Sequence, residues 1–237
     1  MTPSATAPAA ATTVTPTAAH TRHHGSVLAT LEKRLLVWIA GRLPAWVSSD
    51  LLTGLGLVSM LLVGATFAAS ARDPRVLYLV PVLLLVNWFG DSLDGTVARV
   101  RNRQRPRYGY YVDHVVDIVG AVALFGGLAL SGAMQPVIAL LLLVAYIAAM
   151  AEVFLATHVT HVFRLASFGF GPTELRIVLA VGAIALVGRP TVSVPALGRV
   201  PLFDVGGTIA IAGIALAFLV SSVRTARQLA REERLDA

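Results

Sequence analysis

The sequence predicts an all-α integral membrane protein with six transmembrane helices. The 237-residue chain is 56% hydrophobic and only 14% charged, whereas soluble domains carry about 25% charged residues. Its apolar residues also fall into separate runs, most of which approach the roughly 20 residues that a helix needs to cross a bilayer. The chain has no cysteine, which excludes disulfide frameworks and thiolate metal sites.

The two ends of the chain differ from its middle. Residues 1–26 are rich in Ala, Thr and Pro, a composition typical of a disordered tail. Residues 28–43 place apolar side chains at helical spacing and charged side chains on other faces, which predicts an amphipathic helix lying on the membrane. We expect a membrane domain over residues 27–225, followed by a basic cytoplasmic tail, residues 226–237, near anionic lipid.

Six membrane spans are predicted between these ends, over about residues 49–70, 76–98, 110–130, 136–157, 172–187 and 205–223. Of the 19 Lys and Arg residues, only four fall in the connections assigned to the outer side: Arg72, Arg75, Arg189 and Arg199. Because cytoplasmic loops carry the excess of basic residues, both termini are expected in the cytoplasm. Topology also explains the net charge of +6, so no nucleic-acid partner is expected.

One stretch carries more charge than its apolar surroundings favour. It runs from Asp91 to Asp117 and holds two pairs of aspartates with five arginines between them. Asp91 and Asp94 are three residues apart, and Asp113 and Asp117 are four apart, so each pair lies on one helical face. Carboxylates at membrane depth are costly and by default mark a functional site. Three predicted spans also run short of apolar residues on this same side, which indicates a polar cavity open to the cytoplasm.

The short connection between the two pairs predicts that the two helices are antiparallel neighbours, so that four carboxylates converge. Such a cluster needs protons or divalent cations to neutralise it, and oxygen ligands without cysteine favour Mg²⁺ or Mn²⁺. Pairing of the aspartates with the arginines of the connection is the simpler alternative. Gly95 and Ala98 leave space beside the aspartates and Arg99 adds positive charge, which suggests a diphosphate site; tight helix packing would also explain the two small residues.

The same residues resemble the signature of a known family. The pattern Asp91-x-x-Asp94-Gly95-x-x-Ala98-Arg99, followed by Gly109-x-x-x-Asp113-x-x-x-Asp117, is similar to that of the CDP-alcohol phosphotransferases. These membrane enzymes move a phosphatidyl or other substituted phosphate group from a CDP-linked donor to an alcohol. Nine residues separate Arg99 from Gly109, where the family usually has eight. The predicted helices match the family's layout, so the resemblance covers about residues 28–225.

The resemblance implies a role for each matching residue. Asp91, Asp94 and Asp113 would bind two divalent metal ions, Mg²⁺ or Mn²⁺, and Asp117 would complete the metal shell or act as general base on the acceptor hydroxyl. Ser49-Asp50-Leu51-Leu52-Thr53 resembles the family's Pro-Asn-x-Leu-Thr opening of the first span. Nucleotide contacts are expected from Asp94, Gly95, Ala98, Arg99, Gly109 and Thr53.

The motif leaves the acceptor unnamed. We expect its pocket to involve Arg164, Glu174, Arg176 and His114, although helix capping and positive-inside anchoring would also explain the first three. The expected donor is CDP-diacylglycerol, the acceptor a polar alcohol and the setting a bacterial cell membrane, with a homodimer left open. Two alternatives remain: a choline/ethanolamine-type phosphotransferase acting on diacylglycerol, and a transporter that uses the aspartates as an ion relay.

Overall fold

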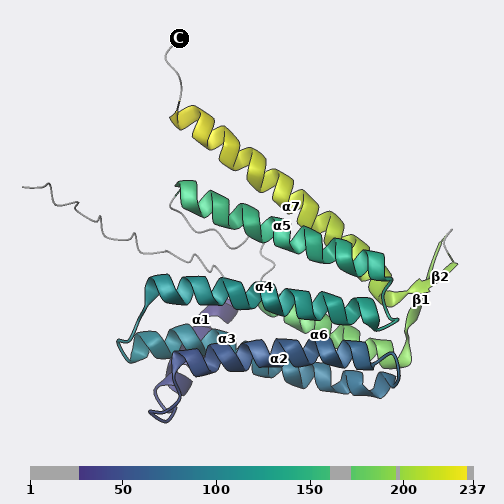
Figure 1. The fold of residues 1–237 in the computed structure, drawn as a ribbon, viewed down its shortest axis with the longest axis horizontal. Helices are drawn as coiled ribbons and strands as arrows, with labels where there is room; N and C mark the ends of the chain where they lie inside the picture. Colours follow the sequence, from purple (N-terminus) through teal and green to yellow (C-terminus); the bar gives the residue numbers. More distant parts are fainter. Residues whose placement is uncertain (1–26, 161–171, 196–197, 234–237) are drawn as a thin grey trace, which may run out of the picture.

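The structure is a computed structural model that describes residues 27–160, 172–195 and 198–233 (Figure 1). The predicted all-α class is confirmed. The elements are α1 (Val27–Ala40), α2 (Ser49–Ala69), a 3₁₀ helix η1 (Pro74–Tyr78), α3 (Leu79–Val100), α4 (Pro106–Leu130), α5 (Pro136–Thr160), α6 (Pro172–Gly188), β1 (Thr191–Val194), β2 (Gly198–Pro201) and α7 (Leu202–Glu232). Between α6 and α7, β1 and β2 form an antiparallel hairpin that was not predicted from the sequence.

Five helical segments of the described chain are long and apolar enough to cross a membrane: Ser49–Ala69, Pro74–Val100, Pro106–Leu130, Pro136–Thr160 and Leu202–Glu232. The chain is therefore a multi-pass membrane protein. The fifth predicted span corresponds to α6, which has 17 residues. At 1.5 Å per residue it reaches about 25 Å, short of the roughly 30 Å of a typical hydrocarbon core. Helix α7 runs unbroken to Glu232, seven residues beyond the predicted end of the membrane domain.

Small residues set how α2 packs. A Cβ atom added at Gly90 of α3 would lie 2.5 Å from the carbonyl oxygen of Leu52 and 2.8 Å from the backbone nitrogen of Gly56, both on α2. Likewise, a Cβ atom at Gly64 of α2 or Gly127 of α4 would overlap the backbone of the other helix. Backbones come this close in membrane proteins where neither helix carries a side chain.

Helix α2 therefore packs along both α3 and α4, whereas α3 and α4 make few close approaches to each other. The predicted direct pairing of the two aspartate-bearing helices is wrong for this reason. A short connection requires only that their ends be close, and the small residues of α2 determine which helix lies against each of them.

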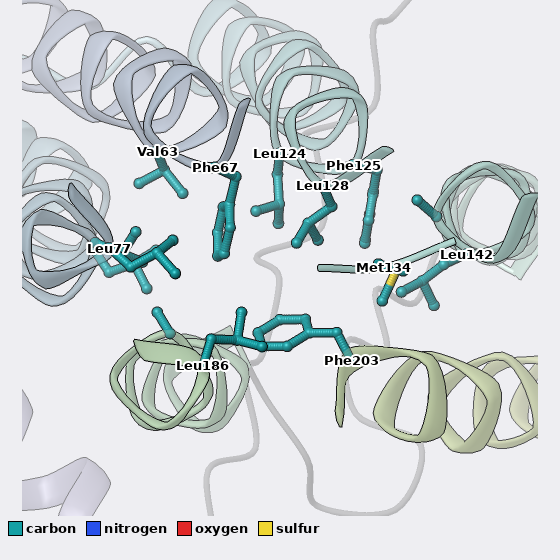
Figure 2. Close-up of a cluster of buried hydrophobic side chains, with 14 of the residues drawn as sticks. Val63, Phe67, Leu77, Leu124, Phe125, Leu128, Met134, Leu142, Leu186 and Phe203 are labelled. Atoms are coloured by element: carbon teal, nitrogen blue, oxygen red, sulfur yellow. The ribbon is translucent and has the colours of Figure 1, made fainter. Parts of the chain in front are cut away.

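The main hydrophobic core occupies one end of the bundle, away from the aspartates. Figure 2 shows side chains from α2, α4, α5, α6 and α7 meeting there, including Phe67, Leu128 and Phe203. The rings of Phe67 and Phe203 meet edge to face, with centroids 6.0 Å apart. A Cβ at Gly207 of α7 would crowd Met134 and Ile138, at 2.8 and 2.9 Å. Apolar packing thus joins the helices at this end and leaves the other end free for polar groups.

A smaller apolar cluster fixes α1 beside the aspartate end. Leu36 and Ala40 of α1 are buried together with Val47, Leu52, Leu93 and Val97. The indole N–H of Trp88 also donates to Glu32 of α1 at 2.9 Å. On the other side of α1, Leu35, Val37 and Trp38 are exposed. Helix α1 is therefore held against α3 by one face while another apolar face is left uncovered.

Helices α5 and α7 lie side by side and are inclined to the rest of the bundle (Figure 1). Near their far ends the hydroxyl of Ser221 donates to Glu152 at 2.9 Å. At the opposite end, the buried carboxylate of Asp204 in α7 accepts a hydrogen bond from the backbone of Gln135 at 2.7 Å, just before α5 begins. The pair is thus joined by polar contacts at both ends.

Candidate active site

Asp91 on α3 is held by a chain of contacts that crosses three helices. Arg176 of α6 donates from Nη2 to Asp91 Oδ2 at 2.6 Å and from Nε to Asn87 Oδ1 at 2.8 Å. Asn87 in turn donates from Nδ2 to the carbonyl oxygen of Gly56 on α2 at 3.0 Å. Because Asn87 lies four residues before Asp91, both are on one face of α3 and one guanidinium can reach both.

Asp94 is oriented by α2. Its Oδ2 accepts a hydrogen bond from Thr53 Oγ1 at 2.7 Å, and its Oδ1 accepts one from the backbone N–H of Gly95. Thr53 was expected at the nucleotide. The structure places it on a carboxylate that was expected to bind both metal and nucleotide, so its hydroxyl fixes the orientation of that carboxylate.

Asp113 and Asp117 face the same region from α4. Asp117 lies three turns into α4, yet it is exposed, so it borders space that protein side chains do not fill. It is close enough to Asp91, Asp94 and Asp113 for each of them to act on it electrostatically. The two aspartate pairs therefore share one region although their helices do not pack directly.

The four carboxylates are not drawn together into a finished ligand set. Within the described ranges, no three acidic or histidine side chains are grouped so that they could hold one ion as they stand. The separation of α3 and α4 accounts for this, as do the contacts of Asp91 with Arg176 and of Asp94 with Thr53. The chemistry of the donors nevertheless fits a divalent cation, because four oxygen-donating carboxylates that repel one another leave an excess of negative charge.

The small residues and Arg99 border this region on the side of the α3–α4 connection. A Cβ atom at Gly95 would lie 3.2 Å from Nη1 of Arg99, so the guanidinium covers the glycine, and Arg99 Nη2 donates to Thr96 Oγ1 at 2.9 Å. Ala98 is half-buried, and a Cβ at Gly109 would meet nothing within 4 Å. Open space at Gly109 is compatible with the nucleotide contact that was expected there.

The residues expected at the acceptor are spread over three places. Arg176 lies on Asp91, inside the carboxylate region. Glu174 is exposed in the first turn of α6. The ring of His114 contacts the tilted rings of Tyr110 and of Phe154 on α5, with centroids 4.2 and 4.6 Å away. Arg164 lies outside the described residues.

Two polar residues of this region, Asn87 and Tyr146, were not predicted from the sequence. Asn87 was detectable as an isolated amide within an apolar run, one helical turn before Asp91. Tyr146 is half-buried on α5 and close enough to Asp117 for an electrostatic interaction. A lone tyrosine in an apolar helix gives a weak signal, because only the packing of α5 shows which way it faces.

Comparison with known proteins agrees with the motif. The family model for CDP-alcohol phosphatidyltransferase matches residues 46–222, which include every helix from α2 to α6 and most of α7. No curated protein sequence shows significant similarity to the chain. Members of this family transfer substituted phosphate groups, work in lipid biosynthesis and use divalent metal ions. With the aspartate pattern, the shared carboxylate region and three quarters of its length matched, this chain belongs to the CDP-alcohol phosphatidyltransferase family.

Proposed function

We propose that this protein transfers the phosphatidyl group of CDP-diacylglycerol to the hydroxyl of a polar alcohol and releases CMP. One observation carries the proposal beyond the family match. Asp91, Asp94 and Asp113 act electrostatically on the accessible carboxylate of Asp117, so residues from two separate motif halves share one region that borders open space. A reaction at a diphosphate needs such a concentration of ligands for cations.

Different residues would bind the metal ions and the nucleotide. Asp91, Asp94 and Asp113 would hold two divalent ions, Mg²⁺ or Mn²⁺, with Thr53 orienting Asp94 and Arg176 orienting Asp91. Bound ions would neutralise the diphosphate and the leaving CMP. Gly95, Ala98, Arg99 and Gly109 would border the nucleotide.

Asp117 completes the ligand set or takes the proton of the acceptor hydroxyl. As a base it accepts that proton while the oxygen attacks the phosphorus nearest the lipid, and the bond from that phosphorus to the CMP oxygen breaks. The exposure of Asp117 supports this role.

We further propose that α6 is a sixth span and that the aspartates face the cytoplasm. Helix α6 packs along α3 and η1; Arg176 near its start reaches Asp91, and Ala183 and Leu186 near its end are buried in the main core. It therefore extends from the polar end of the bundle to the apolar end. The bias of basic residues supports cytoplasmic termini, in a bacterial cell membrane.

The exposed apolar side of α1 supports its placement at the membrane interface. Leu35 and Trp38 are 48% and 56% exposed, while Arg42 stacks on Trp38 at 3.9 Å. A surface helix of this kind would lie beside the lipid donor, whose acyl chains stay in the bilayer.

Release of CMP by purified protein tests the proposal. Labelled CDP-diacylglycerol is supplied with Mg²⁺ or Mn²⁺ and a panel of alcohols: glycerol 3-phosphate, inositol phosphate and serine. A second arm supplies CDP-choline or CDP-ethanolamine with diacylglycerol, and a third measures ion flux in proteoliposomes. CMP release in the first arm that disappears in Asp117→Asn is the expected result. Release only in the second arm assigns the alternative donor, and ion flux without CMP release in either arm overturns the transferase proposal.

A further inference from the structure

Arg101 makes contacts unlike those of the other arginines in the α3–α4 connection. Its Nη2 donates to the carbonyl oxygens of Leu43 and Pro44 at 2.9 and 3.0 Å. Its Nη1 donates to those of Val47 at 2.5 Å and Ala45 at 3.4 Å. One guanidinium thus donates hydrogen bonds to four carbonyl oxygens of the segment that joins α1 to α2.

The backbone at the end of α3 fixes where this guanidinium starts. Asn102 adopts a left-handed conformation with φ 52°, and its N–H donates to Arg99 at 3.1 Å while that of Arg103 donates to Ala98 at 2.9 Å. This pair of bonds is the Schellman arrangement that ends a helix sharply. Arg101 is therefore the C-cap residue of a sharply ended helix, and its side chain extends from a fixed point.

The neighbouring arginines show that charge alone does not produce these contacts. Arg103 is exposed, and within the described residues its side chain has no hydrogen bond or ion pair. Arg105 is also exposed; it pairs with Asp50 and stacks on Tyr108. Arg101 is half-buried, and the hydrogen bonds of its guanidinium to described residues all go to backbone carbonyl oxygens. The fold therefore places Arg101 among these carbonyl oxygens, and a general attraction of arginines to this surface does not explain its contacts.

The carbonyls that Arg101 holds lie immediately before the start of α2. Val47 precedes Ser48, whose side chain caps α2 by accepting from Leu51 at 3.1 Å. Thr53, which donates to Asp94, follows one turn later, and Asp94 lies two turns before Arg101 on the same face of α3. The contacts of Arg101 and the Thr53–Asp94 hydrogen bond therefore both join the start of α2 to the end of α3, two helical turns apart along α3.

We propose that Arg101 is a positioning residue for the active site. By holding the segment 43–47 on the end of α3, it sets the level at which α2 begins, and so keeps Thr53 against Asp94. It also ties the interfacial helix α1 to the aspartate-bearing end of α3. Its effect on metal binding rests on the function proposed above, whereas its effect on the α1–α2 segment does not.

Spin-label distances test the structural half. The chain has no cysteine, so Ala45→Cys with Val82→Cys gives a unique pair of labels at exposed positions, one on the segment and one on α3. Arg101→Gln is expected to broaden the distance distribution and Arg101→Lys to give an intermediate one, because an ammonium group reaches fewer carbonyls. Arg103→Gln removes the same charge from the same connection and is expected to leave the distribution unchanged.

Binding of Mn²⁺, followed by electron paramagnetic resonance without substrate, tests the functional half. Loss of a ligand's hydrogen-bond partner typically costs roughly 10- to 100-fold in metal affinity. Because Arg101→Gln would loosen Thr53 from Asp94 without removing it, we expect that variant to lose about tenfold in Mn²⁺ affinity. Arg103→Gln is expected to lose less than twofold. A purely structural arginine would lower thermal stability without changing Mn²⁺ affinity in the folded fraction.

The outcomes separate the two proposals. An unchanged distance distribution, or equal Mn²⁺ affinity in Arg101→Gln and Arg103→Gln, overturns the positioning role. If the parent protein binds no Mn²⁺ and releases no CMP, the proposed function fails and the active-site role of Arg101 falls with it, while the distances still decide whether Arg101 fixes the α1–α2 segment. Should Arg101→Gln not fold, Arg101→Lys provides both measurements.

Discussion

Gly90 lies where α3 comes closest to α2, one residue before Asp91. In Gly90→Ala the new Cβ would start 2.5 Å from the carbonyl oxygen of Leu52, whereas ordinary contact begins at 3.4 Å. The obstacle is backbone on a packed helix, so α3 must shift by about 1 Å relative to α2. Overpacking of this kind costs about 1–3 kcal/mol, and a 1 Å misplacement of catalytic groups can lower the rate by about 100-fold.

Gly126→Ala on α4 is the matched control, because a Cβ at Gly126 meets nothing within 4 Å. It carries the same gain in helix propensity, about 1 kcal/mol, without the clash. Thermal unfolding and CMP release are measured for both variants. We expect Gly90→Ala to lose stability and most of its kcat/KM, and Gly126→Ala to lose neither. Activity within twofold of the parent in Gly90→Ala would refute the view that close α2–α3 packing positions Asp91 and Asp94.

Three further substitutions test individual residues. Asp117→Asn should lower kcat by roughly 100-fold or more if the carboxylate is the base, with unchanged helix content by circular dichroism; a smaller loss leaves it only a ligand role. Thr53→Val should weaken Mn²⁺ binding by roughly 10- to 100-fold, while Thr53→Ser, which keeps the hydroxyl, should bind like the parent; equal affinity in both would remove Thr53 from the site. Gly95→Leu should displace Arg99 and weaken CDP binding measured by calorimetry. Gly95→Ala should be tolerated, because its Cβ meets the far end of the flexible Arg99 side chain, 3.2 Å away. Tight CDP binding by Gly95→Leu would contradict the nucleotide assignment.

Much of the fold follows from local features of the sequence. The predicted spans lie within a few residues of α2, α5 and α6, because each begins or ends at Pro136, Pro172 or a polar residue that a membrane helix does not continue through. The turn before α5, which separates two predicted spans, contains Gly132 with φ +71°. The 3₁₀ start of the second span and the β1–β2 hairpin were missed, since both are too short for a periodic pattern to reveal them.

For the candidate site, the sequence predicted the aspartates but not the residues that contact them. The spacing of the aspartates placed each pair on one helical face, and the structure brings both pairs into one region. The partners of these aspartates were not predictable, because Thr53, Arg176 and Asn87 reach them from other helices or through packing. A sequence pattern records which residues share a helix face and says nothing about which helix lies opposite.

The sequence by itself determined the membrane setting, the family and the four carboxylates, because hydropathy, charge bias and motif spacing are properties of neighbouring residues. Tertiary structure alone decided that α2 lies against both aspartate-bearing helices. The close backbone contacts at Gly90 and Gly127 that hold it there cannot be recognised from a side-chain pattern. It also decided which acceptors Arg101 reaches. The sequence does not distinguish Arg101 from the neighbouring arginines of the connection. The position of the α1–α2 carbonyls does, since a hydrogen bond depends on where its acceptors are held in space.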